Sequence, residues 1–209
     1  MSIYFYVKCE WRDQILNMDF KSHLVAFSIV LIVFLVSTLI VVVIIDPVQH
    51  VYFPEITPFA TLLFLPHGVR VIVTWLYGVW SIPYLFFATI FADLLIRGSA
   101  DPTVIFITAI VCYASFELFK LCGLDMYKMK NMKSKNLWRS LLLVAFVSSV
   151  FNSVLHNIVL QSQILPENAL QTMLSYMVGD VLGTLVLFFI TLLIVKAIGL
   201  TKVKINFWP

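Results

Sequence analysis

The sequence contains little charge. Lys, Arg, Asp and Glu make up 12% of the 209 residues, whereas a soluble domain is typically about 25% charged. Hydrophobic residues make up 61%, and the mean hydropathy is +0.99. No polar stretch is long enough to form a soluble domain of its own. This composition excludes an ordinary soluble domain and indicates an integral membrane protein.

Cysteine is also scarce. Cys9, Cys112 and Cys122 show no CxxC or CxxxH spacing, and an odd number argues against a disulfide framework or a zinc site. We therefore expect the cysteines to be small apolar fillers, and we predict no metal or cofactor. We expect no signal peptide of normal form, because acidic residues precede the first apolar run and that run is too long for an h-region.

What the sequence does contain is a series of apolar runs. Six runs of roughly 20 residues, joined by short loops, account for its length and predict an all-α, polytopic membrane helical bundle with six transmembrane helices. An interfacial segment of mixed basic and aromatic residues (1–23) precedes the transmembrane domain (24–196), and a tail (197–209) follows it. The predicted spans are Leu24–Ile45, Ile56–Leu76, Ile82–Ile96, Thr103–Lys120, Ser140–Leu160 and Thr172–Val195.

The second run contains the stretch Leu65-Pro66-His67-Gly68-Val69-Arg70. Proline removes a backbone donor and disrupts a helix interior, so we expect the second helix to be broken at Pro66–Gly68. Such a break frees backbone groups inside the membrane, and His67 and Arg70 add polar groups that are costly there. Other parts of the chain are therefore expected to supply polar partners at this depth.

The basic residues predict the orientation. Twelve of the fourteen Lys and Arg residues fall in segments 1–23, 120–139 and 196–209, which lie on one face in a six-span arrangement. By the positive-inside rule this face is cytoplasmic, so we expect a multi-pass protein of the cell inner membrane with both termini in the cytoplasm. The basic loop at 121–139 is expected to face anionic lipid or to dock a protein partner, and a nucleic-acid role is disfavoured.

Polar residues of three spans lie at similar predicted depths. In the fifth span, Ser149, Asn152 and His156 follow the spacing of one helix face, and the last span carries Asp180. At about 1.5 Å per residue, these groups lie roughly 8–20 Å below the outer surface, like the groups of the second span. We predict a binding site for an unidentified small molecule from His67, Arg70, Ser149, Asn152, His156 and Asp180.

A structural role is the alternative for each of these residues. Arg70 and Asp180 could form only an ion pair that joins two helices, and the serines and Asn152 could supply interhelical hydrogen bonds. Gly179 and Gly183 form a small-xxx-small pair, which permits close helix approach. The sequence leaves the structural and the ligand-binding interpretations open.

Two motifs together resemble a known family. They are the stretch Leu65–Arg70 followed by Trp75–Pro83, and Gly179-Asp180-Val181-Leu182-Gly183. Their pattern resembles the first class of bacterial membrane-associated sensor domains, which are usually fused to kinase or cyclase domains. The resemblance implies a ligand-sensing membrane module. The chain departs from the family in having six predicted spans instead of about eight and no output domain, so we expect it to act through a separate partner.

Two further functions remain as alternatives. One is a solute transporter or the substrate-binding subunit of an importer, although the first span has only Ala26 where an alanine-rich docking face is usual. The other is an intramembrane enzyme that uses Cys112 with a histidine and an arginine. The following Tyr113-Ala114-Ser115 does not fit the sorting-type transpeptidases that this set resembles. We therefore predict a sensor-like binding module that is not an enzyme.

Overall fold

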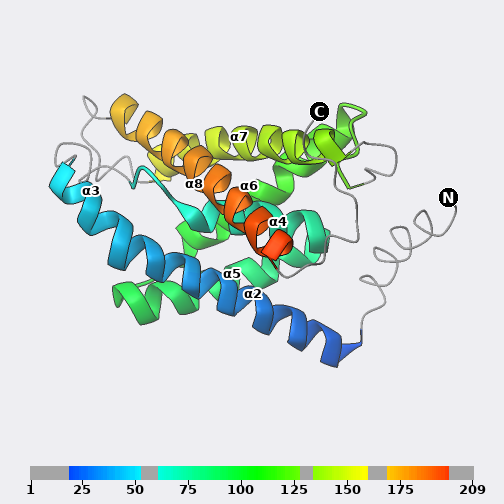
Figure 1. Ribbon diagram of the computed structural model, residues 1–209, viewed down its shortest axis with the longest axis horizontal. Coiled ribbons are helices and arrows are strands. Elements are labelled where there is room, and N and C mark those ends of the chain that lie inside the picture. Colours follow the sequence, from blue (N-terminus) through cyan, green and yellow to red (C-terminus); the bar gives the residue numbers. More distant parts are fainter. Residues whose placement is uncertain (1–18, 53–60, 128–133, 160–168, 198–209) are drawn as a thin grey trace, which may run out of the picture.

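The computed structural model describes residues 19–52, 61–127, 134–159 and 169–197 (Figure 1). These residues form helices and short connections, with no strand among them, which confirms the all-α class. The expectations for residues 1–18, for the basic residues at 128–133, for the polar loop at 161–168 and for the tail at 198–209 lie outside the described residues.

The elements are α2 (Phe20–Ile40), a π-helical turn (Val41–Ile45), α3 (Asp46–Tyr52), α4 (Leu65–Tyr77), a 3₁₀ turn (Gly78–Trp80), α5 (Ser81–Ala92), a second π-helical turn (Asp93–Arg97), α6 (Pro102–Leu121), α7 (Ser134–Val159) and α8 (Ala169–Ala197).

The outward faces of the helices are apolar. On α2, for example, Val25, Ile29 and Ile32 are each more than half exposed, whereas a surface helix of a soluble protein carries polar residues on that side. Five helical stretches of the described chain are long and apolar enough to cross a membrane: Phe20–Tyr52, Leu65–Arg97, Pro102–Leu121, Trp138–Val159 and Ala169–Ile194. The fold is therefore that of an integral membrane protein.

Helix α4 lies at the centre of the bundle and differs from the expected broken span. It begins at Leu65 and runs without interruption to Tyr77, so Pro66 occupies its first turn. A proline there removes a backbone donor that would have no helical partner anyway, which explains why the helix starts at this point and does not break. The expected break at Pro66–Gly68 is thus a helix start. With 13 residues, α4 is about 20 Å long and shorter than the roughly 30 Å hydrocarbon core.

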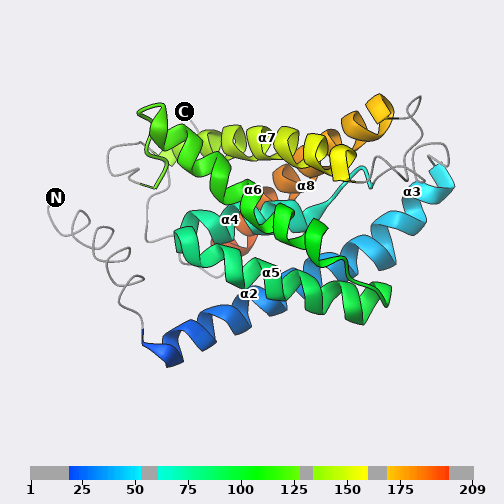
Figure 2. The ribbon, with the colours of Figure 1, turned by 180° about the vertical axis from the view of Figure 1, so that it is seen from behind.

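After α4 the chain reverses direction. Gly78 has φ 57° and ψ −127°, a backbone conformation that glycine adopts without steric cost. Helix α5 then runs back beside α4 and α2 (Figure 2), with Ala88 and Ala92 completely buried at the contact. The reversal lies beside the first turn of α2, where the rings of His23 and Trp80 are 4.4 Å apart. The segment 61–80 therefore runs from the α3 end of the bundle to the opposite end.

The non-helical segment 61–64, which leads into α4, crosses α8 in close contact. Phe64 N donates to Gly179 O at 2.9 Å, and a Cβ atom on Gly179 or Gly183 would overlap the carbonyl oxygen of Thr61 or Phe64. On its other side the segment is held by α3, since Leu62 N donates to Gln49 Oε1 at 2.6 Å. The glycine pair of α8 therefore permits close approach, as expected, but of a non-helical segment and not of a second helix.

Alanine at Gly179 or Gly183 should destabilise the fold, because each new Cβ overlaps a backbone carbonyl that cannot move away as a side chain can. Overpacking of this kind costs about 1–3 kcal/mol, so the thermal unfolding midpoint in detergent should fall. Val178→Ala, on the exposed side of the same helix, is the matched control. A Gly183→Ala protein that unfolds no earlier than this control would contradict the close contact.

Candidate functional site

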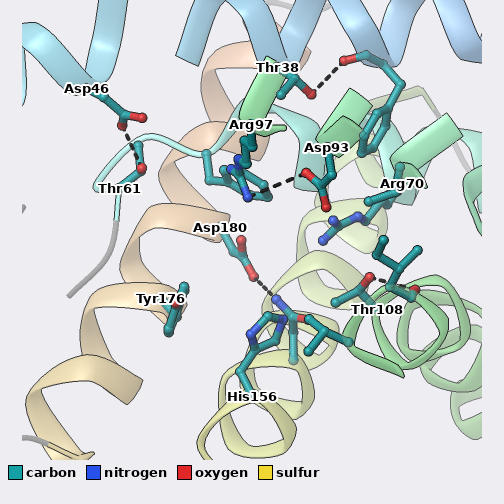
Figure 3. A pocket seen from close by; sticks show the side chains of 16 residues that line it. Thr38, Asp46, Thr61, Arg70, Asp93, Arg97, Thr108, His156, Tyr176 and Asp180 are labelled. Atoms are coloured by element: carbon teal, nitrogen blue, oxygen red, sulfur yellow. Dashed lines mark hydrogen bonds and ion pairs between the residues drawn. The ribbon is translucent and has the colours of Figure 1, made fainter. Parts of the chain in front are cut away.

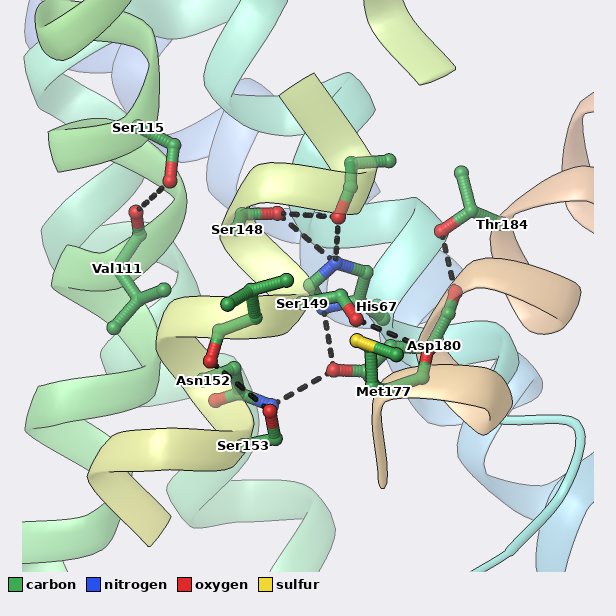
Figure 4. Close-up of polar contacts among 12 residues, drawn as sticks. His67, Val111, Ser115, Ser148, Ser149, Asn152, Ser153, Met177, Asp180 and Thr184 are labelled. Carbon is green, nitrogen blue, oxygen red and sulfur yellow. Dashed lines mark hydrogen bonds and ion pairs between the residues drawn. The ribbon is translucent and has the colours of Figure 1, made fainter. Parts of the chain in front are cut away.

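The buried carboxylate of Asp180 joins three helices. Its Oδ2 atom accepts a hydrogen bond from Asn152 Nδ2 of α7 at 2.9 Å and lies 3.3 Å from His67 Nδ1 of α4 (Figure 4). All three residues are at most 4% exposed. The structure thus brings His67, Asn152 and Asp180 together as predicted, but the direct partner of Asp180 is His67 and not Arg70.

The other ring nitrogen of His67, Nε2, contacts Ser148, which was not among the predicted site residues. His67 Nε2 lies 3.0 Å from Ser148 Oγ and 3.3 Å from the carbonyl oxygen of Ala145. Ser148 precedes Asn152 by one helical turn, so the helix-face spacing could have identified it. The predicted Ser149 instead donates to Met177 O at 3.0 Å and fastens α7 to α8, which is the structural role considered as its alternative.

The order Asp180–His67–Ser148 matches the carboxylate, imidazole and hydroxyl of a serine-hydrolase triad. Ser148 is completely buried, however, and its hydroxyl also lies 3.0 Å from Ala145 O as a donor. Cys112, the nucleophile of the enzyme alternative, is 1% exposed and contacts Ser148. Neither Ser148 nor Cys112 lines the cavity described next. The buried contacts of Asp180, His67, Asn152 and Ser148 join α4, α7 and α8.

A cavity of about 320 Å³ lies beside this network, at the end of the bundle that contains α3 (Figure 3). Of the predicted residues, Arg70, Asn152, His156 and Asp180 line it, whereas His67 and Ser149 do not. The remaining lining residues are Phe34, Thr38, Asp46, Thr61, Phe64, Thr89, Asp93, Arg97, Val104, Ile105, Thr108 and Tyr176. The charged members of this set, Asp46, Asp93 and Arg97, were not predicted as site residues.

Arg70 is a buried cation without an ion-pair partner in the described chain. Its side chain belongs to a residue that is 5% exposed, and no carboxylate oxygen of the described residues comes within 4.0 Å of its nitrogens. The guanidinium carbon lies 5.7 Å from the ring centroid of Phe34 and 5.5 Å from that of Phe64. Such contacts contribute about 0.5–2 kcal/mol, which offsets only part of the cost of removing a cation from water.

The unpredicted charged residues lie at the two π-helical turns. Asp46 follows the turn Val41–Ile45 and accepts a hydrogen bond from Thr61 Oγ1 at 2.7 Å. The second turn contains both Asp93 and Arg97, whose Oδ1 and Nη1 atoms are 3.6 Å apart. A π-helical turn inserts one residue into the helical register and occurs frequently at functional sites. Both turns here direct charge toward the same cavity.

Three buried polar atoms at the cavity have no hydrogen-bond partner in the described structure: Arg70 Nε, Asn152 Oδ1 and His156 Nδ1. The first is a donor, the second an acceptor, and the third either, depending on its protonation. The His156 ring also packs against Tyr176, with centroids 5.3 Å apart. These three atoms are therefore available to bond a polar molecule in the cavity. No group of three His, Cys, Asp or Glu side chains suited to a metal occurs in the described ranges.

Comparisons with known proteins identify no relative. No protein-family model, no curated protein and no solved structure matches the chain. The resemblance to membrane-associated sensor domains therefore stays a prediction.

The pairing of Asp180 can be measured by double-mutant cycles on thermal stability. We expect His67→Gln and Asp180→Asn to be coupled by about 0.5–3 kcal/mol, because the two side chains are in contact. The cycle of Arg70→Gln with Asp180→Asn should give a smaller coupling, since that pair lacks an ion-pair contact. A larger coupling for the arginine pair would favour the pairing expected from the sequence alone.

Proposed function

We propose that this protein is a sensor-like membrane module that binds a small polar molecule in the α3-end cavity and acts through a separate partner. The observation that carries the proposal is Arg70, a buried cation that lines the cavity without an ion-pair partner among the described residues. Asn152, His156 and Asp180 would supply further polar contacts, and His67 would hold Asp180 in place. Ligand pockets commonly combine apolar walls with a few converging polar groups of this kind.

We further propose that the chain crosses the membrane six times, with both termini in the cytoplasm. The reversal at Gly78 supports this count, because segment 61–80 and segment 81–97 run in opposite directions between the two ends of the bundle. The clustering of Lys and Arg in segments 1–23, 120–139 and 196–209 supports the orientation. The cavity would then open toward the outer face, and a partner would bind at the basic cytoplasmic loop.

Cysteine labelling can test the six-crossing arrangement. In a protein whose three native cysteines are replaced by serine, an impermeant maleimide should label Val51→Cys and Ser99→Cys from the same, outer side of intact cells. Both positions are exposed in the structure. A variant that retains only Cys122 should react after the membrane is opened. If Leu65–Arg97 crossed once, positions 51 and 99 would react from opposite sides.

Ligand binding can be tested by thermal shift on the purified protein with a panel of small polar metabolites. We expect at least one compound to raise the unfolding midpoint of the wild-type protein, since a ligand at 100 times its Kd stabilises by about 2.7 kcal/mol. Arg70→Gln should abolish the shift. Arg139→Gln, an exposed arginine on α7, is the matched control and should respond like the wild type.

Two results would contradict this proposal. The first is a panel in which no compound stabilises the wild-type protein. The second is a compound whose effect persists in Arg70→Gln, which would assign Arg70 a structural role. Uptake of a stabilising compound into proteoliposomes would instead favour the transporter alternative.

A further inference from the structure

The cavity contains charges of both signs. Arg70 and Arg97 contribute two positive charges to its wall, while Asp46, Asp93 and Asp180 contribute three carboxylates. A simple anion could pair with Arg70 but would enter a cavity whose formal charge is already negative. A simple cation could pair with a carboxylate but would leave the buried guanidinium of Arg70 unpaired. A buried unpaired charge is strongly destabilising.

The carboxylates differ in how completely they are bonded. Asp180 is held by His67 and Asn152, and Asp46 accepts a hydrogen bond from Thr61. Asp93 has one weaker partner: its contact with Arg97 is 3.6 Å long, compared with about 2.7–2.9 Å for a charge-assisted hydrogen bond. The Arg97 side chain is also 48% exposed, and exposed ion pairs contribute little to stability. Asp93 is therefore the carboxylate best able to accept a second cation.

Arg70 and Asp93 face the same part of the cavity (Figure 3). They form no ion pair with each other in the described structure. A molecule placed between them would meet a donor on one side and an acceptor on the other. Two buried atoms at the cavity without a hydrogen-bond partner are likewise a donor, Arg70 Nε, and an acceptor, Asn152 Oδ1.

We infer that the cavity binds a small zwitterion, with its anionic group on Arg70 and its protonated amine on Asp93. The inference rests on the proposed binding function and specifies its ligand class. A volume of about 320 Å³ is at the lower end of ligand pockets, which suits a molecule of few heavy atoms. The same chemistry is found in free amino acids and in the head group of a zwitterionic lipid.

The test compares zwitterions with molecules that carry only one of the two charges. Glycine, β-alanine and γ-aminobutyrate are titrated into the purified protein in detergent, with acetate, propionate, ethylamine and propylamine as single-charge controls. We expect at least one zwitterion to raise the unfolding midpoint and each single-charge control to bind at least about tenfold more weakly. A second arm compares nanodiscs of phosphatidylethanolamine with nanodiscs of phosphatidylglycerol, without added solute. Stabilisation that requires phosphatidylethanolamine and Arg70 assigns the lipid head group as the source of the zwitterion.

Three variants separate ligand recognition from folding. Arg70→Gln and Asp93→Asn should each weaken zwitterion binding at least tenfold, and Asp93→Asn should bring the affinity for a zwitterion down to that for the matching carboxylate. Arg97→Gln removes the competing cation, so it should leave binding intact or strengthen it. A purely structural Asp93–Arg97 pair would give equal losses in Asp93→Asn and Arg97→Gln, which would overturn the inference.

The outcomes also distinguish this inference from the proposed function. If acetate or propionate binds as tightly as the zwitterions, the cavity recognises a carboxylate alone, so the zwitterion inference fails while the binding function stands. If only compounds outside the zwitterion class stabilise the wild-type protein, the zwitterion inference also fails and the binding function also stands. If neither the zwitterions, nor phosphatidylethanolamine, nor any compound of the broader panel has an effect, both proposals fail.

Discussion

The arrangement of the central helices depends on the burial of one carboxylate. Asp180 lies inside the bundle, where an unpaired charge would cost several kcal/mol, and its partners come from two other helices, His67 on α4 and Asn152 on α7. The requirement to satisfy this group fixes how α4, α7 and α8 are rotated relative to one another. The glycines on either side of Asp180 serve the same packing, since they admit segment 61–64 against the helix. The charge and the close approach are thus two parts of one junction.

The sequence predicted the residues of this junction better than it predicted their pairing. Depth counting placed His67, Asn152 and Asp180 in one layer because helical rise depends only on residue number. It could not tell whether Asp180 would meet His67 or Arg70, because both lie on α4 and the choice depends on the rotation of that helix. Ser148 was missed because its neighbour Ser149 fitted the selected stripe, although Ser148 also lies one turn before Asn152. The packing shows that Ser148 contacts His67 of α4 and that Ser149 contacts α8.

The helix boundaries and the cavity rim were harder to predict. Proline signals a break inside a helix and is also favoured in a first turn, so Pro66 alone does not distinguish the two, and the structure shows the second. Asp93 and Arg97 were not predicted as site residues, because the sequence places them at the end of the third predicted span and just after it. The π-helical turn that contains them changes the register, and a 3.6-residue period cannot anticipate that change. The predicted class, an all-α membrane protein, does not depend on such local changes of register, because it follows from composition and from the apolar runs.

The junction also constrains the order in which the protein can be completed during synthesis. Because α4 precedes α8 in the chain, His67 and Arg70 are synthesised before Asp180. Helix α4 is also short for a spanning helix, and its reversal into the more apolar α5 lets the two enter as a hairpin. Segment 61–64 can pack in its final position only after Gly179 and Gly183 of α8 are in place. Helix α8 therefore completes the junction that α4 begins, and a chain truncated before α8 would leave His67 without its carboxylate partner.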